Sequence, residues 1–192
     1  MLTGSKIRTE RELGNISIEP FNESQLNPNS YNLRLHKNMK VYLPSPDAEV
    51  DDNDDGNFLV DIPIELDAKK DNPVKEIVIP KEGYVLQPGV LYIARTKEIV
   101  GSKEFVPCIS GRSSIARLGI QVHVTAGFGD IGFQGTFTLE ITVVHPVRVY
   151  PNMEICQLYF EPADGPTDMK YNGKYLNQLD ATPSKMYQDF DK

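Results

Sequence analysis

The chain has 192 residues, 40% of them hydrophobic and 24% charged, with a formal net charge of -7. This length suits a single domain with a sizeable core and leaves little room for two. An acidic surface argues against a partner nucleic acid, which needs clustered cations, although a local pocket of donors could still bind a small anion.

The sequence shows no common metal-ligand motif, and we expect no targeting segment. Cys108 and Cys156 are the only cysteines, and no CxxC, HxH or HExxH spacing occurs. We therefore predict no protein metal site, and no zinc. The first residues, MLTGSKIRTERELG, are too charged for a signal peptide, and no apolar run reaches membrane length. We expect a cytoplasmic protein without a membrane partner.

The N-terminal third begins with a short helix followed by strands. Ser5 is the expected N-cap of a helix that runs to Leu13, and Gly14 is its stop. A strand is predicted at 16–21. From Tyr31 the apolar residues alternate with polar ones over 31–35 and 39–43, which indicates two half-buried strands that pair with each other.

An acidic segment with few apolar residues, PDAEVDDNDDG, falls within 45–57. Its composition favours a solvated loop, and we expect an insertion of about 45–75. A carboxylate-rich calcium loop is the alternative, but the EF-hand spacing and its terminal glutamate are absent.

The rest of the chain contains many short apolar runs separated by turn residues. Strands are predicted at 58–64 and 75–80, and the Pro-Gly dipeptide within 83–95 indicates a hairpin. Further runs are QVHVTA, TFTLEITVV, VRVY and MEICQLYF. This pattern predicts a mainly β protein, an antiparallel barrel or sandwich with a few short helices, in one domain over 1–192.

The stretch SGRSSIARLG, residues 110–119, concentrates arginines and serines in one turn. Gly111 permits a turn, Ser113 and Ser114 are the expected N-caps of a helical turn, and Gly119 ends it. Free N–H groups, hydroxyls and Arg112 would make an anion-binding site. A simple capped turn with solvent-facing arginines explains this stretch equally well.

Two later segments favour a functional site. In TFTLEIT, alternation places Thr138 and Glu140 on the face opposite to Phe137, Leu139 and Ile141. A carboxylate that pointed into a cavity there would have a raised pKa suited to acid–base work. Between this strand and the turn lies VTAGFGDIGFQG, whose glycines allow a close ligand approach around Asp130, or simply a wide turn.

These motifs, in this order, resemble the dCTP deaminases of the trimeric dUTPase superfamily. The resemblance rests on GRSSIARLG, HVTAGFGDIGFQG and TLEI, and extends to PNSYNLRL and to YNGKYLNQ with ATPS near the C-terminus. It covers roughly 4–41 and 77–190. The family fold implied is a distorted antiparallel β-barrel or jelly roll that forms a homotrimer, with sites built between subunits and a C-terminal lid around 165–192.

The resemblance also implies roles for individual residues. Glu140 matches the catalytic glutamate, Ser113 and the carbonyl of Ala126 match the groups that hold the attacking water, and Arg117 matches the arginine beside the glutamate. Asp130 matches the aspartate at the deoxyribose 3′-hydroxyl, and Thr138 lies where a side chain meets the base. The positions that match triphosphate and nucleotide contacts are Arg112, Ser114, Tyr171, Lys174 and Gln178.

The implied reaction is hydrolysis of dCTP to dUTP and ammonia, with Mg²⁺ carried by the triphosphate and dTTP as a candidate inhibitor. A bifunctional enzyme that forms dUMP and pyrophosphate is the alternative: Gly127 resembles that group, whereas Ala116 resembles the monofunctional one. A non-catalytic nucleotide-binding module is a third reading. Two departures from the family pattern are Asn32, in place of an aspartate, and Gly129, where isoleucine is more usual.

Overall fold

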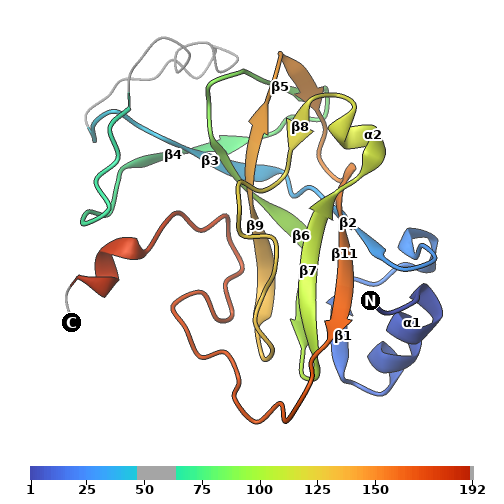
Figure 1. Ribbon diagram of the computed structural model, residues 1–192. Coiled ribbons are helices and arrows are strands. Elements are labelled where there is room, and N and C mark those ends of the chain that lie inside the picture. Colours follow the sequence, from blue (N-terminus) through green and yellow to red (C-terminus); the bar gives the residue numbers. More distant parts are fainter. Residues whose placement is uncertain (47–63, 191–192) are drawn as a thin grey trace.

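Antiparallel strands dominate the computed structural model, which describes residues 1–46 and 64–190 (Figure 1). The helices are short: α1 (Gly4–Glu12), α2 (Ser113–Ala116) and two 3-10 turns, Glu23–Gln25 and Met186–Asp189. The prediction of a mainly β protein with a few short helices is therefore confirmed. Most of the expected acidic loop and nearly all of the strand expected at 58–64 lie outside the described residues.

Within the described ranges the strands form three sheets, and all their pairings are antiparallel. The largest has the order β4-β3-β6-β9-β8, with β1 also paired to β6; the others are β2-β11-β7 and β10-β5. Among the described residues these sheets do not close into one barrel, and the arrangement is jelly-roll-like. The strands are β1 (Ile16–Glu19), β2 (Tyr31–Arg34), β3 (Asn38–Tyr42), β4 (Val74–Val78), β5 (Tyr84–Leu86), β6 (Tyr92–Ser102), β7 (Phe105–Gly111), β8 (Ile120–Gln121), β9 (Gln134–Val143), β10 (Val147–Val149) and β11 (Glu154–Pro162).

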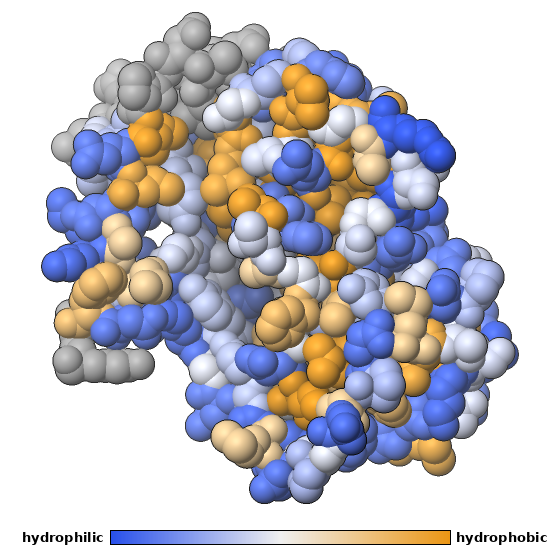
Figure 2. All heavy atoms as spheres, in the orientation of Figure 1, coloured by the Kyte–Doolittle hydropathy of each residue, from blue (hydrophilic) through white to orange (hydrophobic). Residues whose placement is uncertain are grey.

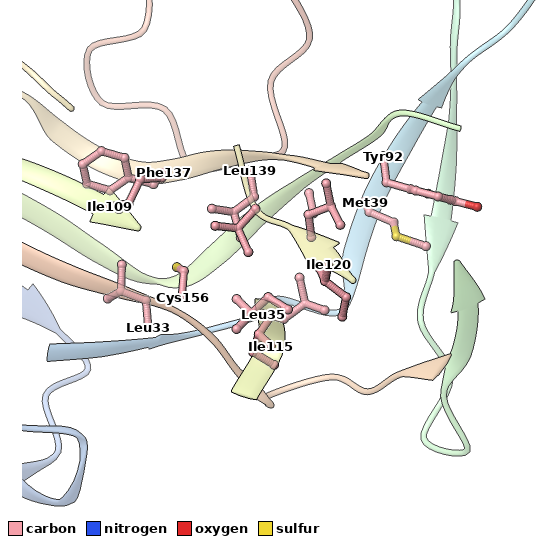
Figure 3. Packing of buried hydrophobic residues seen from close by; sticks show 14 of the residues in the cluster. Leu33, Leu35, Met39, Tyr92, Ile109, Ile115, Ile120, Phe137, Leu139 and Cys156 are labelled. Atoms are coloured by element: carbon pink, nitrogen blue, oxygen red, sulfur yellow. The ribbon is translucent and has the colours of Figure 1, made fainter. Parts of the chain in front are cut away.

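One hydrophobic core fills the space between the largest sheet and the β2-β11-β7 sheet. Leu33 and Cys156 lie opposite Leu139 in this core, and all three are fully buried (Figure 3). Ile115 of α2 packs into the same core with 5% of its surface exposed. The short helix is thereby fixed to the body of the protein, because moving it would expose this side chain to water.

Two predicted strand pairings are wrong. The strands on either side of the Pro-Gly turn do not form a hairpin: β5 pairs with β10, whereas β6 pairs with β1, β3 and β9. The strands β2 and β3 also lie in different sheets, because the chain crosses between the sheets at Leu35, which bridges to Thr96. Local turn chemistry sets the direction of the chain, but the partners of a strand depend on distant segments.

Helix α1 begins earlier than expected, with its N-cap two residues before the predicted one. The N-cap is Thr3, whose hydroxyl accepts a hydrogen bond from the Lys6 N–H at 3.3 Å, so the prediction of Ser5 as N-cap is wrong. Gly14 adopts a φ of +76° just after the helix, as expected of a stop residue. None of the helices in the described ranges is long and apolar enough to cross a membrane.

A buried polar cluster fixes the middle of β6 against its neighbours. The Glu98 side chain is fully buried and accepts hydrogen bonds from the Arg34 Nε at 2.6 Å and the Arg34 backbone N–H at 2.8 Å. At the same irregularity in β6, the Thr96 hydroxyl accepts from the Phe137 N–H at 3.0 Å. Because Phe137 belongs to β9, this bond fixes the register of β9 against β6 close to the residues of its polar face.

Candidate active site

A hollow of about 600 Å³ lies between β9, the glycine-containing loop at 126–133 and the C-terminal segment at 171–184. Figure 2 shows this face of the molecule hollowed beside the C-terminal segment. Six residues that the sequence places in the site line this hollow: Ala126, Asp130, Thr138, Glu140, Tyr171 and Gln178. They come from three segments far apart in the chain, so the fold brings them together.

Glu140 occupies the centre of β9, opposite Ile93 of β6, and its half-buried side chain faces the hollow. Burial raises the pKa of its carboxyl above the usual 4.5, and backbone N–H groups of Val124 and of Glu140 itself partly offset this effect. The sequence suggested that Glu140 would act as an acid–base group if its carboxylate pointed into a cavity and lost hydration. The structure shows this orientation. A raised pKa makes such a group a better proton acceptor than an exposed carboxylate.

The loop that carries Ala126 and Asp130 is pinned to β7 by backbone hydrogen bonds. The Ile109 N–H donates to the Gly127 carbonyl at 2.6 Å, and the Gly129 N–H donates to the Pro107 carbonyl at 2.7 Å. A Cβ at position 127 would lie 3.1 Å from both the His123 ring and the Ile109 carbonyl, so this close approach favours glycine. The pinned loop holds Asp130 at the rim of the hollow.

Gln178 attaches the C-terminal segment to β9. Its side-chain Nε2 donates to the Thr136 carbonyl at 2.8 Å and to the Thr138 hydroxyl at 3.2 Å. The backbone carbonyl of Gln178 accepts from the Thr136 N–H at 2.9 Å. A Cβ at Gly135 would lie 2.7 Å from the Gln178 carbonyl, which explains the glycine. The segment therefore forms one wall of the hollow.

Tyr171 is the aromatic part of that wall. Its backbone N–H donates to the Ile131 carbonyl at 2.7 Å, and its ring packs edge-on against Phe133 at 6.0 Å between centroids. Phe128 and Phe137 also line the hollow. The sequence analysis missed these phenylalanines as site residues: their only signal was a position within or beside the two candidate motifs, and alternation assigned Phe137 to the core.

The remaining predicted residues lie outside the hollow. Ser113, Ser114 and Arg117 are exposed on α2 or directly after it, and Arg112 is the N-cap of that helix without a capping side chain. The prediction of Ser113 and Ser114 as N-caps is thus wrong, since both already lie within the helix. Lys174 is ion-paired with Asp189. Within one chain, α2 and Glu140 do not share the hollow.

No group of three or more potential metal-ligating side chains occurs among the described residues.

The departure at position 129 has a simple geometry. Gly129 does not have a positive φ, and a Cβ there would lie 3.4 Å from the Phe137 ring and from Pro107, which is an ordinary contact. The absence of a side chain at Gly129 leaves this part of the hollow wider than a larger residue would.

Comparison with known proteins assigns the family. A family model described as dCTP deaminase-like matches residues 1–163. The chain belongs to the dCTP deaminase-like family. It is 49% identical over 178 residues to a Clostridium beijerinckii protein named "dCTP deaminase, dUMP-forming", with 93% of this chain and 92% of that protein covered. A Hathewaya histolytica protein of the same name is 46% identical over 191 residues, with 100% and 99% covered.

A solved structure supports the fold. The crystal structure of 2′-deoxycytidine 5′-triphosphate deaminase from Agrobacterium tumefaciens matches with a TM-score of 0.58 at 23% identity. The match covers 84% of this chain but 48% of that longer one. The jelly-roll-like, mainly β fold implied by the sequence motifs is thus confirmed, while this distant neighbour carries no information on individual side chains.

Proposed function

We propose that this protein is a hydrolytic dCTP deaminase. The observation that carries the proposal is Glu140, a half-buried carboxylate with a raised pKa that lines a largely apolar hollow. Ala126, Asp130 and Thr138 surround the same hollow, and the relatives that cover almost the whole chain are named for this activity. A pure nucleotide-binding module has no need of a desolvated acid–base group there.

In the proposed reaction, Glu140 moves the protons. It takes one from a water held by the Ser113 hydroxyl and the Ala126 carbonyl, and the water oxygen then bonds to cytosine C4. Glu140 passes the proton to the ring N3. It then moves the proton of the new C4 hydroxyl to the amine, and the C4–N4 bond breaks to leave a C4 carbonyl and release ammonia. Arg117, placed beside the glutamate in the complete site, orients the carboxylate for this transfer.

The rest of the nucleotide is held by residues around this centre. Asp130 accepts a hydrogen bond from the deoxyribose 3′-hydroxyl, and Thr138 contacts the base. Mg²⁺ enters as part of the substrate, bound to the triphosphate, because hard divalent ions prefer phosphate oxygens. The triphosphate and nucleotide contacts are assigned to Arg112, Ser114, Tyr171, Lys174 and Gln178, and closure of the C-terminal segment excludes water.

We further propose that the complete site forms between copies in a homotrimer. Large hydrophobic side chains are exposed around β8 and the end of α2: Leu118 is 48% exposed, Val124 57% and Val144 69%. Figure 2 shows hydrophobic residues gathered over β8 and the neighbouring end of β9. An apolar surface of this kind is typical of a subunit contact. It would bring α2 of one copy to Glu140 of another.

The product we favour is dUMP with pyrophosphate, rather than the dUTP that the sequence alone slightly favoured. The names of both relatives include "dUMP-forming", in agreement with the Ala126-Gly127 pair in this sequence. Chromatography of a dCTP reaction with Mg²⁺ tests this: we expect ammonia, dUMP and pyrophosphate in equal amounts. Accumulation of dUTP would identify the monofunctional reaction, and tight dCTP binding without any product would support the binding module.

The acidic limb of the pH profile is expected to report Glu140. Because the base acts in its ionised form, the activity falls as the pH drops through its pKa, which burial raises above 4.5. We expect the midpoint of the acidic limb in kcat/KM to lie above that value. Initial rates of ammonia release between about pH 4 and 8 measure this midpoint. The protein must first be shown to stay folded over that range. A midpoint at or below 4.5 would contradict the raised pKa.

A further inference from the structure

Three polar side chains join β2, β11 and the turn before α2 into one chain of contacts. The Asn32 side-chain amide donates to Glu154 Oε2 at 2.9 Å. Arg112 Nη2 lies 2.9 Å from the same oxygen, and Arg112 Nη1 donates to the Glu154 carbonyl at 2.8 Å. Glu154 thus binds the Arg112 guanidinium through both its side-chain carboxylate and its backbone carbonyl.

An irregularity in β11 places Glu154 at this position. The register between β2 and β11 shifts between Glu154 and Cys156, so Glu154 lies opposite Arg34 of β2 while Cys156 pairs with Gly111 at the end of β7. The side chains of Arg112 and Glu154 are 30% and 32% exposed. Partial burial makes such a pair worth more than a fully exposed one.

The Asn32 side chain supplies the hydrogen-bond donor that the Glu154 carboxylate needs. It is 6% exposed, its side-chain carbonyl accepts from the Asn27 amide at 2.9 Å, and its own amide is the donor to Glu154. An aspartate at position 32 would remove that donor and place two carboxylates in contact at a largely buried point. Like charges in such a place repel strongly, and Glu154 would turn away from Arg112.

We propose that Glu154, held by Asn32, is a positioning residue for the candidate active site: it aims the Arg112 guanidinium at the start of α2. The two contacts leave the other N–H groups of Arg112 available to an anion. This inference rests on the proposed function in one respect, the assignment of Arg112 to the triphosphate. It adds that the amide at position 32 and the carboxylate at position 154 work as a pair.

Steady-state kinetics on three variants test the pair: Glu154→Gln, Asn32→Asp and the double swap Asn32→Asp/Glu154→Gln. Loss of one charge-assisted contact should raise the KM for dCTP by about fivefold in Glu154→Gln, and the added repulsion should raise it by about tenfold in Asn32→Asp. The double swap should lower KM again to the Glu154→Gln value, because the introduced carboxylate then accepts from the introduced amide.

The split between KM and kcat separates positioning from general structural damage. We expect kcat to change less than about twofold in all three variants, because the ladder between β7 and β11 still holds the backbone before α2. Glu161→Gln is the matched control: this residue lies on the same strand but pairs with the N-terminal ammonium, so its KM should not change.

Several results would overturn the proposal. These are an unchanged KM in Asn32→Asp, a double swap no better than Asn32→Asp, or losses confined to kcat and the thermal midpoint. If Asn32→Asp does not fold, the dCTP affinity of Glu154→Gln, measured by calorimetry, decides the question, and an unchanged affinity overturns the proposal. A wild-type protein that binds dCTP without releasing ammonia would refute the proposed function alone, and the affinities of the same variants would still test the pair.

Discussion

Replacement of Glu140 by glutamine is expected to abolish ammonia release from dCTP, with a loss of about a thousandfold or more, while dCTP still binds. The amide has the same shape but cannot carry protons between water, ring and leaving group, and general acid–base catalysis contributes roughly 10²- to 10⁴-fold. Calorimetry should give a dCTP affinity close to that of the wild type. An exposed glutamate away from the hollow, in Glu82→Gln, provides the control and should retain full turnover.

Stability distinguishes this catalytic loss from unfolding. Since burial raises the pKa of Glu140 in the folded protein, the folded state binds its proton more tightly than the unfolded state does, and ionisation of Glu140 costs stability as the pH rises through that pKa. The Glu140→Gln variant should therefore be at least as stable as the wild type at pH 7. Substantial turnover in this variant would remove Glu140 from the role of general base, and a lower thermal midpoint at that pH would contradict the stability cost assigned to its ionisation.

Short-range patterns in the sequence were sufficient to predict the strand that carries the site. Side chains on a strand alternate between its faces, so TFTLEIT alone predicted that Thr138 and Glu140 share a face, and both line the hollow. Backbone conformation also followed where glycine was needed, as at Gly14 and Gly119, which both have a positive φ. These features depend on neighbours in the chain.

Features that depend on distant segments could not be predicted in this way. Nothing in the sequence between Tyr84 and Arg95 shows that β5 pairs with β10 and β6 with β9. The wall built by Gln178 likewise requires bonds to Thr136 across 42 positions of the chain. The ion pair of Arg112 with Glu154 arises from a register shift in β11, which no local pattern indicates.

The position of α2 leads to the second large expected effect, the recovery of activity from two inactive variants. Ser113 and Arg117 are exposed on or next to a helix that Ile115 anchors in its own core, and neither lines the hollow with Glu140. A site that needs both must therefore draw α2 from another copy. We expect Ser113→Ala and Glu140→Gln to be nearly inactive alone, and mixed oligomers of the two to be active.

The size of the recovery follows from the mixing. In every mixed trimer one of the three interfaces joins an intact Ser113 to an intact Glu140, so purified mixed trimers should regain about a third of the wild-type activity. Co-expression with two different tags and tandem purification yields the mixed oligomers. Mixtures of Ser113→Ala with Arg117→Ala serve as the control and should stay inactive, because neither chain offers an intact α2. If the first mixture also stays inactive, the helix does not complete the site of a neighbouring copy, and the proposed arrangement between subunits is wrong.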